Sequence, residues 1–538
     1  MKRRQAIKIS SIGAIGVATS INTSCSNNNF FFHHGVASGD PLEDRVILWT
    51  RVTPIQPGPL EVILEISESK EFSKVVFSHK LITSSLSDYT IKYDFLATKY
   101  CNSDRGFFYR FKAGDAISEI GKSKTFPKNT EKAKIGIFSC SNYPAGFFNA
   151  YQAAAEKNDL DLWLHLGDYL YEYPMGGYAT DRAKKLGRIP NPLHEMITLS
   201  DYRKRHAQYK LDLGSQALHK SAPLIAVWDD HEFSNDAWKQ GAENHSEDGS
   251  EGDFYARRSA AIKAYYEWMP IREQKNKRKI FREFTIGKLI HLIMLDTRQY
   301  ARDRQIQPKD YLGQSGFNQA KFYNDLNSKN RNLLGFEQLS WVEKSISKSN
   351  AVWTILGQQV LMTKLQFPDL SKMMQAEDIP SFVKPYLKFL DLGIPSNLDA
   401  WDGYPEERKK LYKLMKNAGK HFISLAGDTH NSWVSELQNH KHEKVGIELG
   451  TPSVTSPGIT DLLNLNEGKF VESIIKINKE LQWMDPSNRG FLSLEIQEDS
   501  ILATFNYIKE LDKINSKIKS SKSFVIRQKN LALKELKS

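Results

Sequence analysis

Four short apolar runs in this chain each lead into a turn that carries metal-binding side chains. Strands that are covered on both faces of a sheet read as continuous apolar runs, and ligands bind at the carboxyl ends of such strands. The sequence therefore predicts four buried strands whose ends meet at one site. The runs and their turns are 135–139 with Cys140, 162–166 with 167–168, 224–228 with 229–232, and 422–426 with 427–430.

Residues 134–510 as a whole alternate between strand-like and helix-like patterns, which is typical of an α/β domain. We expect two packed β-sheets flanked by helices, with the site at one rim of the strand ends. The irregular stretch 361–402 is expected to form a loop over the mouth of that site. Helices are predicted at 147–156, 201–211, 336–348 and 406–418, a hairpin at 281–286 and 289–295, and further strands at 352–356, 490–496 and 502–505.

The two ends of the chain differ from this middle part. Residues 30–126 show short alternating apolar and polar runs separated by Pro, Gly, Asp and Ser, which predicts an N-terminal antiparallel β-sandwich domain with a structural or shielding role. The polar stretch 128–134 is the expected linker to the α/β domain. Residues 511–538 are rich in lysine and are predicted to be a weakly helical tail.

Residues 1–29 are expected to be an export signal and not part of the fold. Arg3 and Arg4 form a twin-arginine pair, and the apolar run 9–21 is shorter than the ~20 residues that a membrane-spanning helix needs. We therefore expect the twin-arginine export machinery as a partner, and a mature protein that is periplasmic, on the cell surface or secreted. Cys25 follows a small residue, as in a lipoprotein cleavage site, and is a candidate for a lipid anchor. The alternative is cleavage by an ordinary signal peptidase, followed by release.

Composition adds two constraints. The formal net charge of +11 indicates attraction to anions, but no basic module with base-reading elements is present, so nucleic acid is not expected as a specific partner. Three cysteines in 538 residues do not make a disulfide framework. A single bridge between Cys101 and Cys140 is the structural alternative to a metal-binding role for Cys140.

Cys140 and Tyr171 are the most informative pair of candidate ligands. A thiolate together with a phenolate favours a trivalent metal such as Fe3+ over a site built for calcium or magnesium alone. Asp168 lies three residues before Tyr171 and is our candidate for a carboxylate that bridges two metal ions. The alternatives are that Asp168 caps a turn, and that Tyr169 or Tyr173 takes the place of Tyr171.

The motifs Gly-Asp-x-x-Tyr at 167–171, Trp-Asp-Asp-His-Glu at 228–232 and Gly-Asp-x-His at 427–430, after Phe-Ser-Cys at 138–140, resemble the PhoD-like alkaline phosphatase family. This family belongs to the calcineurin-like metallophosphoesterase group, and the resemblance extends from about residue 32 to about 507. It implies a metallophosphoesterase-type catalytic domain at 134–510. It also implies an iron held by Cys140, Asp168 and Tyr171, with Ca2+ ions completing the cluster through carboxylates.

The resemblance assigns further roles around the second motif. Asp230 and His231 stand where the wider group has Asn-His, so Asp230 is expected to bind a hard ion such as Ca2+. His231 is expected to contact the phosphate or to protonate the leaving group. Glu232 is expected to orient His231 through a hydrogen bond. Asp229 is the alternative to Asp230 as the ligand, and the sequence leaves the choice open.

Asp428 and His430 are the expected ligands of the last motif. In an extended strand, residues two apart point to the same side, so both are expected to face the cluster. The wider group has His in both positions, and Asp at the first strengthens the case for calcium. Arg188 and Arg298 are candidates for bidentate phosphate binding, and a surface ion pair is the alternative for each.

These expectations combine into one function. We expect an exported metal-dependent alkaline phosphatase or phosphodiesterase that hydrolyses phosphate mono- or diesters with a metal-activated water. One alternative is a phospholipase D-type phosphodiesterase that uses the same site. Another is an exported binding protein whose catalytic site is degenerate. Turnover of p-nitrophenyl phosphate and of its bis-ester distinguishes these functions.

Overall fold

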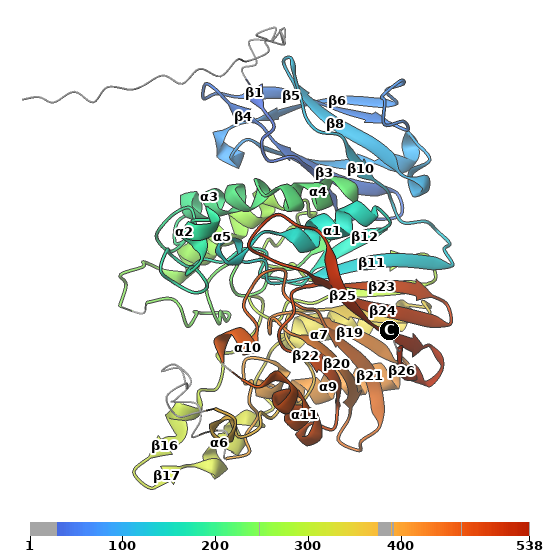
Figure 1. Ribbon diagram of the computed structural model, residues 1–538. Helices are drawn as coiled ribbons and strands as arrows, with labels where there is room; N and C mark the ends of the chain where they lie inside the picture. The colour runs from blue at the N-terminus through green and yellow to red at the C-terminus, as the bar shows by residue number, and fades with distance from the viewer. Residues whose placement is uncertain (1–29, 247, 375–388, 390–391, 464, 537–538) are drawn as a thin grey trace, which may run out of the picture.

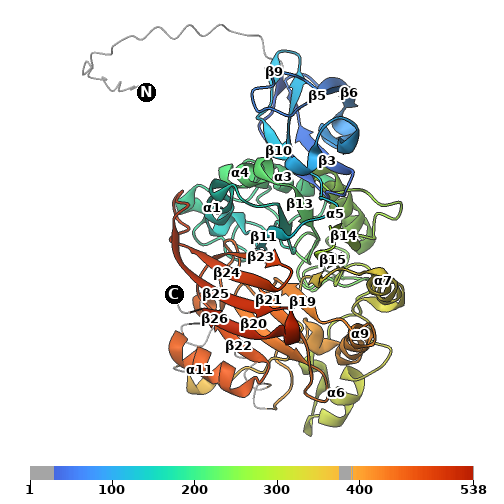
Figure 2. The same ribbon diagram turned by 90° about the vertical axis from the view of Figure 1, so that its right-hand side faces the viewer.

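Two large β-sheets lie at the centre of the protein (Figure 1, Figure 2). The computed structural model describes residues 30–536 except 247, 375–388, 390–391 and 464. The first sheet has the strand order β26 (Leu533–Leu536), β25 (Ile518–Arg527), β24 (Ser500–Ile508), β23 (Gly490–Gln497), β11 (Lys132–Phe138), β12 (Leu162–His165), β13 (Leu224–Ala226), β2 (Val36–Gly39), β3 (Arg45–Arg51) and β7 (Thr90–Leu96). The second has the order β14 (Arg282–Ile286), β15 (Ile290–Met294), β18 (Trp353–Gly357), β19 (Phe422–Ala426), β21 (Lys444–Gly450), β20 (Ser432–Gln438) and β22 (Leu481–Asp485).

The central strands of both sheets are parallel, and all of them except β21 were predicted from the sequence. In the first sheet Ile135 pairs with Leu162, and Trp163 with Leu224, so β11, β12 and β13 end at the same rim. In the second, β15, β18, β19 and β21 are parallel. Apolar residues from both sheets share one buried core. The predicted architecture of two packed sheets is therefore confirmed, because continuous apolar runs need cover on both faces.

Helices cover the outer faces of the two sheets, as the sequence predicts. On the second sheet, α7 (Gly335–Lys348) and α9 (Pro405–Asn417) bury Val342 and Leu411 in a core with Leu356 of β18. Four more helices lie between strands β11 and β12 and the upper, N-terminal part of the molecule (Figure 1). They are α1 (Asn149–Lys157), α3 (Leu199–Lys210), α4 (Leu213–Ser221) and α5 (Phe254–Trp268). Thr198 and Asp201 form a capping box that starts α3.

The N-terminal region is a sandwich, but one of its sheets is not its own. Strands β2, β3 and β7 form one layer and also continue the ten-stranded sheet, since Gly39 of β2 pairs with Leu224 of β13. Val46 in this layer and Val62 and Phe111 in the other belong to the same core. The sandwich is thus tied to the α/β domain by backbone pairing as well as by a linker. The other layer consists of β10 (Gly121–Ser123), β8 (Phe107–Ala113), β5 (Leu60–Ser67) and β6 (Phe77–Thr83), with β9 (Ala116–Ile117) beside β8.

The prediction of a weakly helical C-terminal tail is wrong. Residues 518–527 form β25, which pairs along its length with β24, and β26 pairs with β25. Phe524 and Ile526 are buried in the main core. These two buried residues alternate with the less buried Ser523, Val525 and Arg527, which is a strand pattern, and the abundance of lysine nearby concealed it.

Several other expectations bear on cysteines and on membranes. Cys101 and Cys140 are both free, so the alternative of a disulfide between them is excluded. The twin-arginine segment and Cys25 lie outside the described residues. Within the described part of the chain, no helix combines the length and the apolar character needed to cross a bilayer.

Candidate metal centre

The candidate site lies at the carboxyl ends of β11, β12, β13 and β19, where the chain turns sharply. Cys140, Asp168, Asp428 and His430 all have left-handed backbone conformations, with φ angles of 58°, 55°, 65° and 64°. A residue with a side chain is held in this conformation at a cost on the order of 1 kcal/mol or more, and such residues concentrate at functional sites. The four side chains are therefore held at the site by turns with a strained backbone.

Gly167 at the end of β12 allows two of these turns to approach each other. A Cβ atom on this residue would lie 2.3 Å from the Cβ of Asp229, and its φ of 107° disfavours any side chain. The glycine of the Gly-Asp pair is thus required by the contact between neighbouring strand ends.

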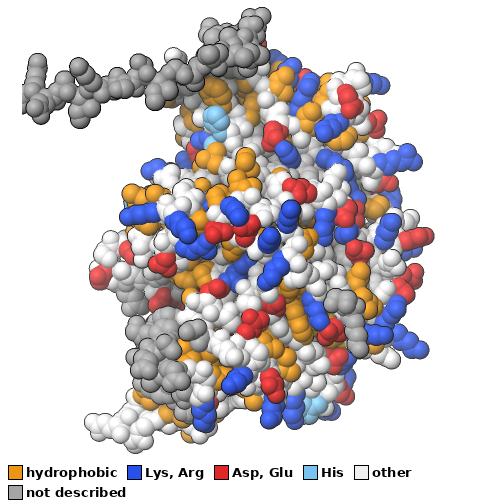
Figure 3. Space-filling view, in the orientation of Figure 1, with side chains coloured by type: hydrophobic (Ala, Val, Ile, Leu, Met, Phe, Trp, Pro, Cys, Tyr) orange, Lys and Arg blue, Asp and Glu red, His pale blue; other side chains and the backbone are white. Residues whose placement is uncertain are grey.

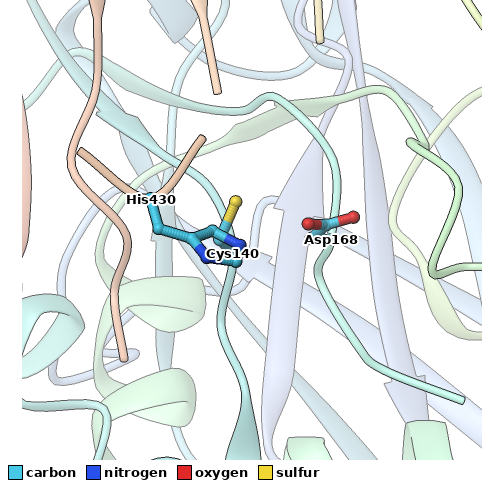
Figure 4. Close-up of side chains that lie close together, drawn as sticks. All are labelled: Cys140, Asp168 and His430. Atoms are coloured by element: carbon cyan, nitrogen blue, oxygen red, sulfur yellow. The ribbon is translucent and has the colours of Figure 1, made fainter. Parts of the chain in front are cut away.

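The buried Cys140 and Asp168 and the half-buried His430 form one group, with candidate ligand atoms within 4.8 Å of one another (Figure 4). Tyr171 belongs to it, because its Oη donates a hydrogen bond to Asp168 Oδ2 at 3.0 Å and lies 3.2 Å from His430 Nε2. Ser456 Oγ donates to the same Oη at 2.7 Å. We call Cys140, Asp168, Tyr171 and His430 the thiol–phenol group. It contains the three residues expected around an iron, and His430 in addition.

The two tyrosines that compete with Tyr171 lie elsewhere. Tyr169 Oη bonds to His219 Nε2 at 2.9 Å, on the far side of the turn. The ring of Tyr173 lies beside the His231 ring, with centroids 5.3 Å apart. Tyr171 is therefore the tyrosine that reaches Asp168.

Burial disfavours the deprotonated, negatively charged forms of the residues in the thiol–phenol group. Burial and the nearby Asp168 carboxylate raise the pKa of Cys140 and the pKa of Tyr171 well above their ordinary values. Burial also lowers the pKa of His430 to about 3, so this imidazole is neutral at physiological pH. A neutral imidazole is the form that binds metals. A bound cation would reverse the first two effects, because it stabilises the thiolate and the phenolate.

Asp168 is shared with a second group that contains Asp230 and His231. Burial opposes ionisation of Asp230, but the charges of Arg298 and His231 outweigh it and lower the pKa of this carboxyl. Burial likewise opposes the charged form of His231, and the carboxylates of Asp230 and Glu172 outweigh it and raise its pKa well above the usual range. Because one carboxylate belongs to both groups, Asp168 stands where a bridging ligand is expected.

A third group, of Asp229, Asp230 and Asp428, surrounds the guanidinium of Arg298. Arg298 is fully buried. Its Nε bonds to Asp229 Oδ1, its Nη2 donates to Asp428 Oδ1 at 3.0 Å, and its Nη1 lies 2.7 Å from Asp399 Oδ2. We call Asp229, Asp399, Asp428 and Arg298 the carboxylate–arginine group. Arg298 thus neutralises carboxylates inside the protein, which excludes both the phosphate-binding and the surface alternatives in this conformation.

The contacts of Asp229 and Asp230 separate their roles. Asp229 is bonded to the guanidinium, whereas Asp230 lies 3.7 Å from it and shares a group with Asp168 and His231. Asp230 is therefore placed towards the thiol–phenol group, and Asp229 towards Arg298.

Three expectations about side chains are wrong. Glu232 does not orient His231: its carboxylate accepts the backbone N–H groups of Asp168 (3.0 Å) and Asp229 (2.7 Å) and so joins two strand-end turns. Arg188 is absent from the cluster. It is buried, 2.7 Å from Asp212, with its guanidinium 3.6 Å from the centroid of the Tyr143 ring.

The third error concerns Asp428 and His430. The two were expected to face one way in an extended strand, but β19 ends at Ala426 and both residues are left-handed. They therefore point into different groups, Asp428 towards Arg298 and His430 towards Cys140.

Glu172 is the main residue that sequence reasoning missed. Its buried carboxylate lies 2.8 Å from His231 Nδ1 and accepts hydrogen bonds from Asn235 N (2.7 Å) and Asn244 Nδ2 (3.0 Å). It lies four residues after Asp168 and directly follows the Gly-Asp-x-x-Tyr motif, which is a usable signal. The adjacency of Glu232 to His231 in the sequence suggested the wrong partner. Asp399 was also missed, because nothing in the irregular stretch around it marks it.

The residues present fit one or more metal ions. Asp168 Oδ1, Asp229 Oδ2 and Asp230 Oδ1 are buried and have no hydrogen-bond partner among the described residues. Buried polar atoms are normally partnered, so these oxygens point to a missing cation. Sulfur, phenol and imidazole donors in the thiol–phenol group suit a transition metal. The carboxylate oxygens suit a harder ion.

Comparison with known proteins gives a consistent result over nearly the whole chain. The family model described as PhoD-like phosphatase matches residues 135–505, and the model of the PhoD-like phosphatase N-terminal domain matches residues 17–127. Alkaline phosphatase D of Bacillus subtilis (strain 168) is 30% identical over 542 residues, which cover 97% of this chain and 85% of that protein. The solved structure described as "Structure of PhoD" superposes with a TM-score of 0.79 at 30% identity, covering 94% of this chain and 92% of the other.

Proposed function

This chain belongs to the PhoD-like phosphatase family, and from that premise we propose that it is an exported, metal-dependent hydrolase of phosphate mono- or diesters. The observation that carries the proposal is the overlap of two ligand groups at Asp168, with buried carboxylate oxygens that lack partners. Bound metal ions would supply positive charge for the phosphate and lower the pKa of a water nucleophile.

We assign the metals by donor chemistry. Cys140, Asp168, Tyr171 and His430 would hold an iron, because thiolate and phenolate together favour Fe3+. Asp168 and Asp230 would hold Ca2+ through oxygen. Asp428 offers a further oxygen, since its side chain keeps an exposure of 19%. Burial, partly offset by Arg298, raises its pKa to about 7, so a nearby cation would also decide its charge.

His231 is the proposed proton donor for the leaving group. Its Nδ1 faces Glu172 at 2.8 Å, which leaves Nε2 for the substrate. Glu172 is charged as well as buried: burial raises its pKa, but His231 and the two hydrogen bonds to the carboxylate outweigh this and lower it. An imidazolium held between carboxylates can protonate an alkoxide.

Turnover by the metal-loaded protein tests this function directly. Hydrolysis of p-nitrophenyl phosphate or of bis-p-nitrophenyl phosphate supports it. Absence of turnover of either ester, with metal bound, favours a binding protein. A visible charge-transfer band from iron with Tyr171 or Cys140 would support the assignment of the metal. Zinc as the sole stoichiometric metal, or full activity of Cys140→Ser, would contradict it.

Export by the twin-arginine route is a separate part of the proposal. Replacement of Arg3 and Arg4 by Lys should retain the precursor in the cytoplasm. If the mature protein is still exported, the general secretory route carries it. Incorporation of labelled palmitate, and its loss in Cys25→Ala, would show a lipid anchor.

A further inference from the structure

A small lobe protrudes from the molecule at the lower left of Figure 1. It contains β16 (Leu312–Gly313), β17 (Gly316–Phe317), α6 (Gln319–Leu326) and the segment 392–398. Its apolar residues form a core of their own, separate from the cores under the two sheets. Ile306, Phe322 and Leu398 belong to this core.

A cavity of about 170 Å³ lies between this lobe and the metal centre. Ile306, Ile394 and Leu398 keep exposures of 7%, 4% and 8%, whereas Phe322, deeper in the same core, has none. The parts of these three side chains that stay accessible form the apolar wall of the cavity. The apolar lining residues are Ile306, Pro308, Phe389, Ile394, Pro395 and Leu398.

The opposite wall is polar and belongs to the metal centre. Asp236 and Asp399 line it. The backbone N–H of Asp236 donates to Asp230 Oδ2 at 2.7 Å. Asp399 accepts a hydrogen bond from Arg298 at 2.8 Å, and the same guanidinium donates to Asp428. Asp236 and Asp399 therefore belong both to the wall of the cavity and to the hydrogen-bond network of the candidate ligands Asp230 and Asp428.

Most polar atoms of the lining are already used within the protein. Gln305 Nε2 donates to Asp399 Oδ1 at 2.6 Å and to the Asp236 carbonyl at 3.0 Å. Asn397 Oδ1 accepts the backbone N–H of Asp399, and Ser396 Oγ accepts that of Phe367. The surface that this arrangement leaves for a ligand is chiefly apolar.

We propose that this cavity is a specificity pocket that binds an apolar ester group of the substrate. The proposal rests on the function proposed above, and it names the substrate class: phosphate esters of an aryl alcohol or of a compact branched or cyclic alkyl alcohol. An apolar cavity of ~150 Å³ is large enough for benzene, so a cavity of about 170 Å³ holds one six-membered ring.

Competitive inhibition by two phosphonates tests the pocket without differences in leaving-group chemistry. Benzylphosphonate mimics phenyl phosphate, and ethylphosphonate mimics methyl phosphate, with the same charged head group in both. In the wild type, benzylphosphonate should inhibit roughly tenfold more strongly or better, as a filled apolar pocket allows. Equal inhibition by the two would overturn the pocket, while the hydrolase function would stand.

Two variants change the pocket in different ways. Ile306→Asn makes its wall polar, and Ile394→Trp fills it. Both should abolish the preference for benzylphosphonate and change inhibition by ethylphosphonate by no more than about twofold. Leu312→Asn is the control, because Leu312 lies in the same lobe, is 40% exposed and is absent from the lining. It should keep the preference.

The outcomes separate the two hypotheses. A preference that persists in Ile306→Asn and Ile394→Trp, with both proteins folded by circular dichroism, overturns the pocket alone. If only one variant folds, the preference in that variant decides. If neither phosphonate binds in calorimetry and no ester is hydrolysed, the proposed function fails, and the pocket fails with it.

Discussion

The two halves of the metal centre differ in how their charges are neutralised. In the carboxylate–arginine group, one guanidinium contacts Asp229, Asp399 and Asp428. The thiol–phenol group lies on the other side of Asp230. In the described part of the chain, no Lys or Arg forms an ion pair with Asp168 there. One half carries its own cation, and the other half needs a cation from outside.

This difference separates a structural device from a binding site. In the carboxylate–arginine group, Arg298 supplies part of the positive charge within the protein. Burial still outweighs this charge at Asp229 and raises the pKa of its carboxyl well above the usual range. The thiol–phenol group without a cation must keep its thiol and phenol protonated, as their raised pKa values indicate. Asp168 also belongs to the group of Asp230 and His231, so a metal ion bound at Asp168 would change the charge around both groups.

The largest expected effect is that of Asp168→Asn. A neutral amide cannot bridge two cations as a carboxylate does, so this variant should lose bound metal and all measurable activity. Metal content by elemental analysis and turnover of p-nitrophenyl phosphate are the measurements.

Asp229→Asn is the matched control, because Asp229 is just as buried but is bonded to Arg298. It should lose less metal than Asp168→Asn, because Asp168 belongs to two ligand groups and Asp229 to one. Equal loss of metal in the two variants would show that the two halves of the centre do not differ in the way argued above.

His231→Ala should follow in size. General acid–base assistance contributes ~10²–10⁴-fold, so turnover should fall within that range while the metals stay bound. The loss should be smaller for p-nitrophenyl esters than for alkyl esters, because p-nitrophenolate needs no proton to leave.

Two results would revise the role of His231. Loss of metal in His231→Ala would make it a ligand. An equal loss for both classes of ester would make it a phosphate-binding residue that transfers no proton.

The same comparison explains what could be predicted from the sequence. Apolar runs specify strands, and strand ends specify which turns meet, so Cys140, Asp168 and His430 were correctly brought together before the fold was known. Their grouping depended on backbone conformation at single residues. Left-handed φ angles at Asp428 and His430 send two neighbours into different groups, and no pattern of apolar positions encodes this.

Contacts between side chains far apart in the sequence were the other feature that could not be predicted. Arg188 and Arg298 look alike as isolated arginines, yet one pairs with Asp212 under a tyrosine ring and the other sits among carboxylates. Asp399 comes from an irregular stretch with no periodicity. Such contacts are decided by tertiary packing, so only the folded chain assigns them.

Arg298→Met tests the neutralised half. Removing one partner from a buried ion pair costs about 3–5 kcal/mol, so the melting temperature without added metal should fall. Ca2+ should then stabilise the variant more than it stabilises the wild type, because a cation can replace the lost charge. Thermal melts with and without Ca2+ measure both effects.

Arg298→Lys keeps a charge at the position and is the control for Arg298→Met. It should lose less stability and gain less from Ca2+. If Ca2+ stabilises the wild type and Arg298→Met equally, the guanidinium does not substitute for a metal ion.

Glu172→Gln should have the smallest effect, and it tests the influence of a buried negative charge on His231 beside the metal centre. The amide keeps the shape and the carbonyl acceptor of Glu172 but removes a charge 2.8 Å from His231 Nδ1. A positioning partner of this kind typically accounts for about 10–100-fold in activity.

The dependence of the rate on pH should show in which direction Glu172→Gln shifts the pKa of His231. Burial lowers the pKa of His231, and the carboxylates of Asp230 and Glu172 outweigh it and raise the pKa above its usual range. Activity that needs the imidazolium is therefore retained below this raised pKa and lost as pH rises through it. Without the Glu172 charge the pKa of His231 falls, so the alkaline limb of the rate profile should move to lower pH.

Glu232→Gln is the matched control. Glu232 accepts hydrogen bonds from backbone amides of the turns, so its loss should lower stability and leave the alkaline limb in place. An alkaline limb that stays fixed in Glu172→Gln as well would limit Glu172 to packing and remove the charge coupling from the proposed role of His231.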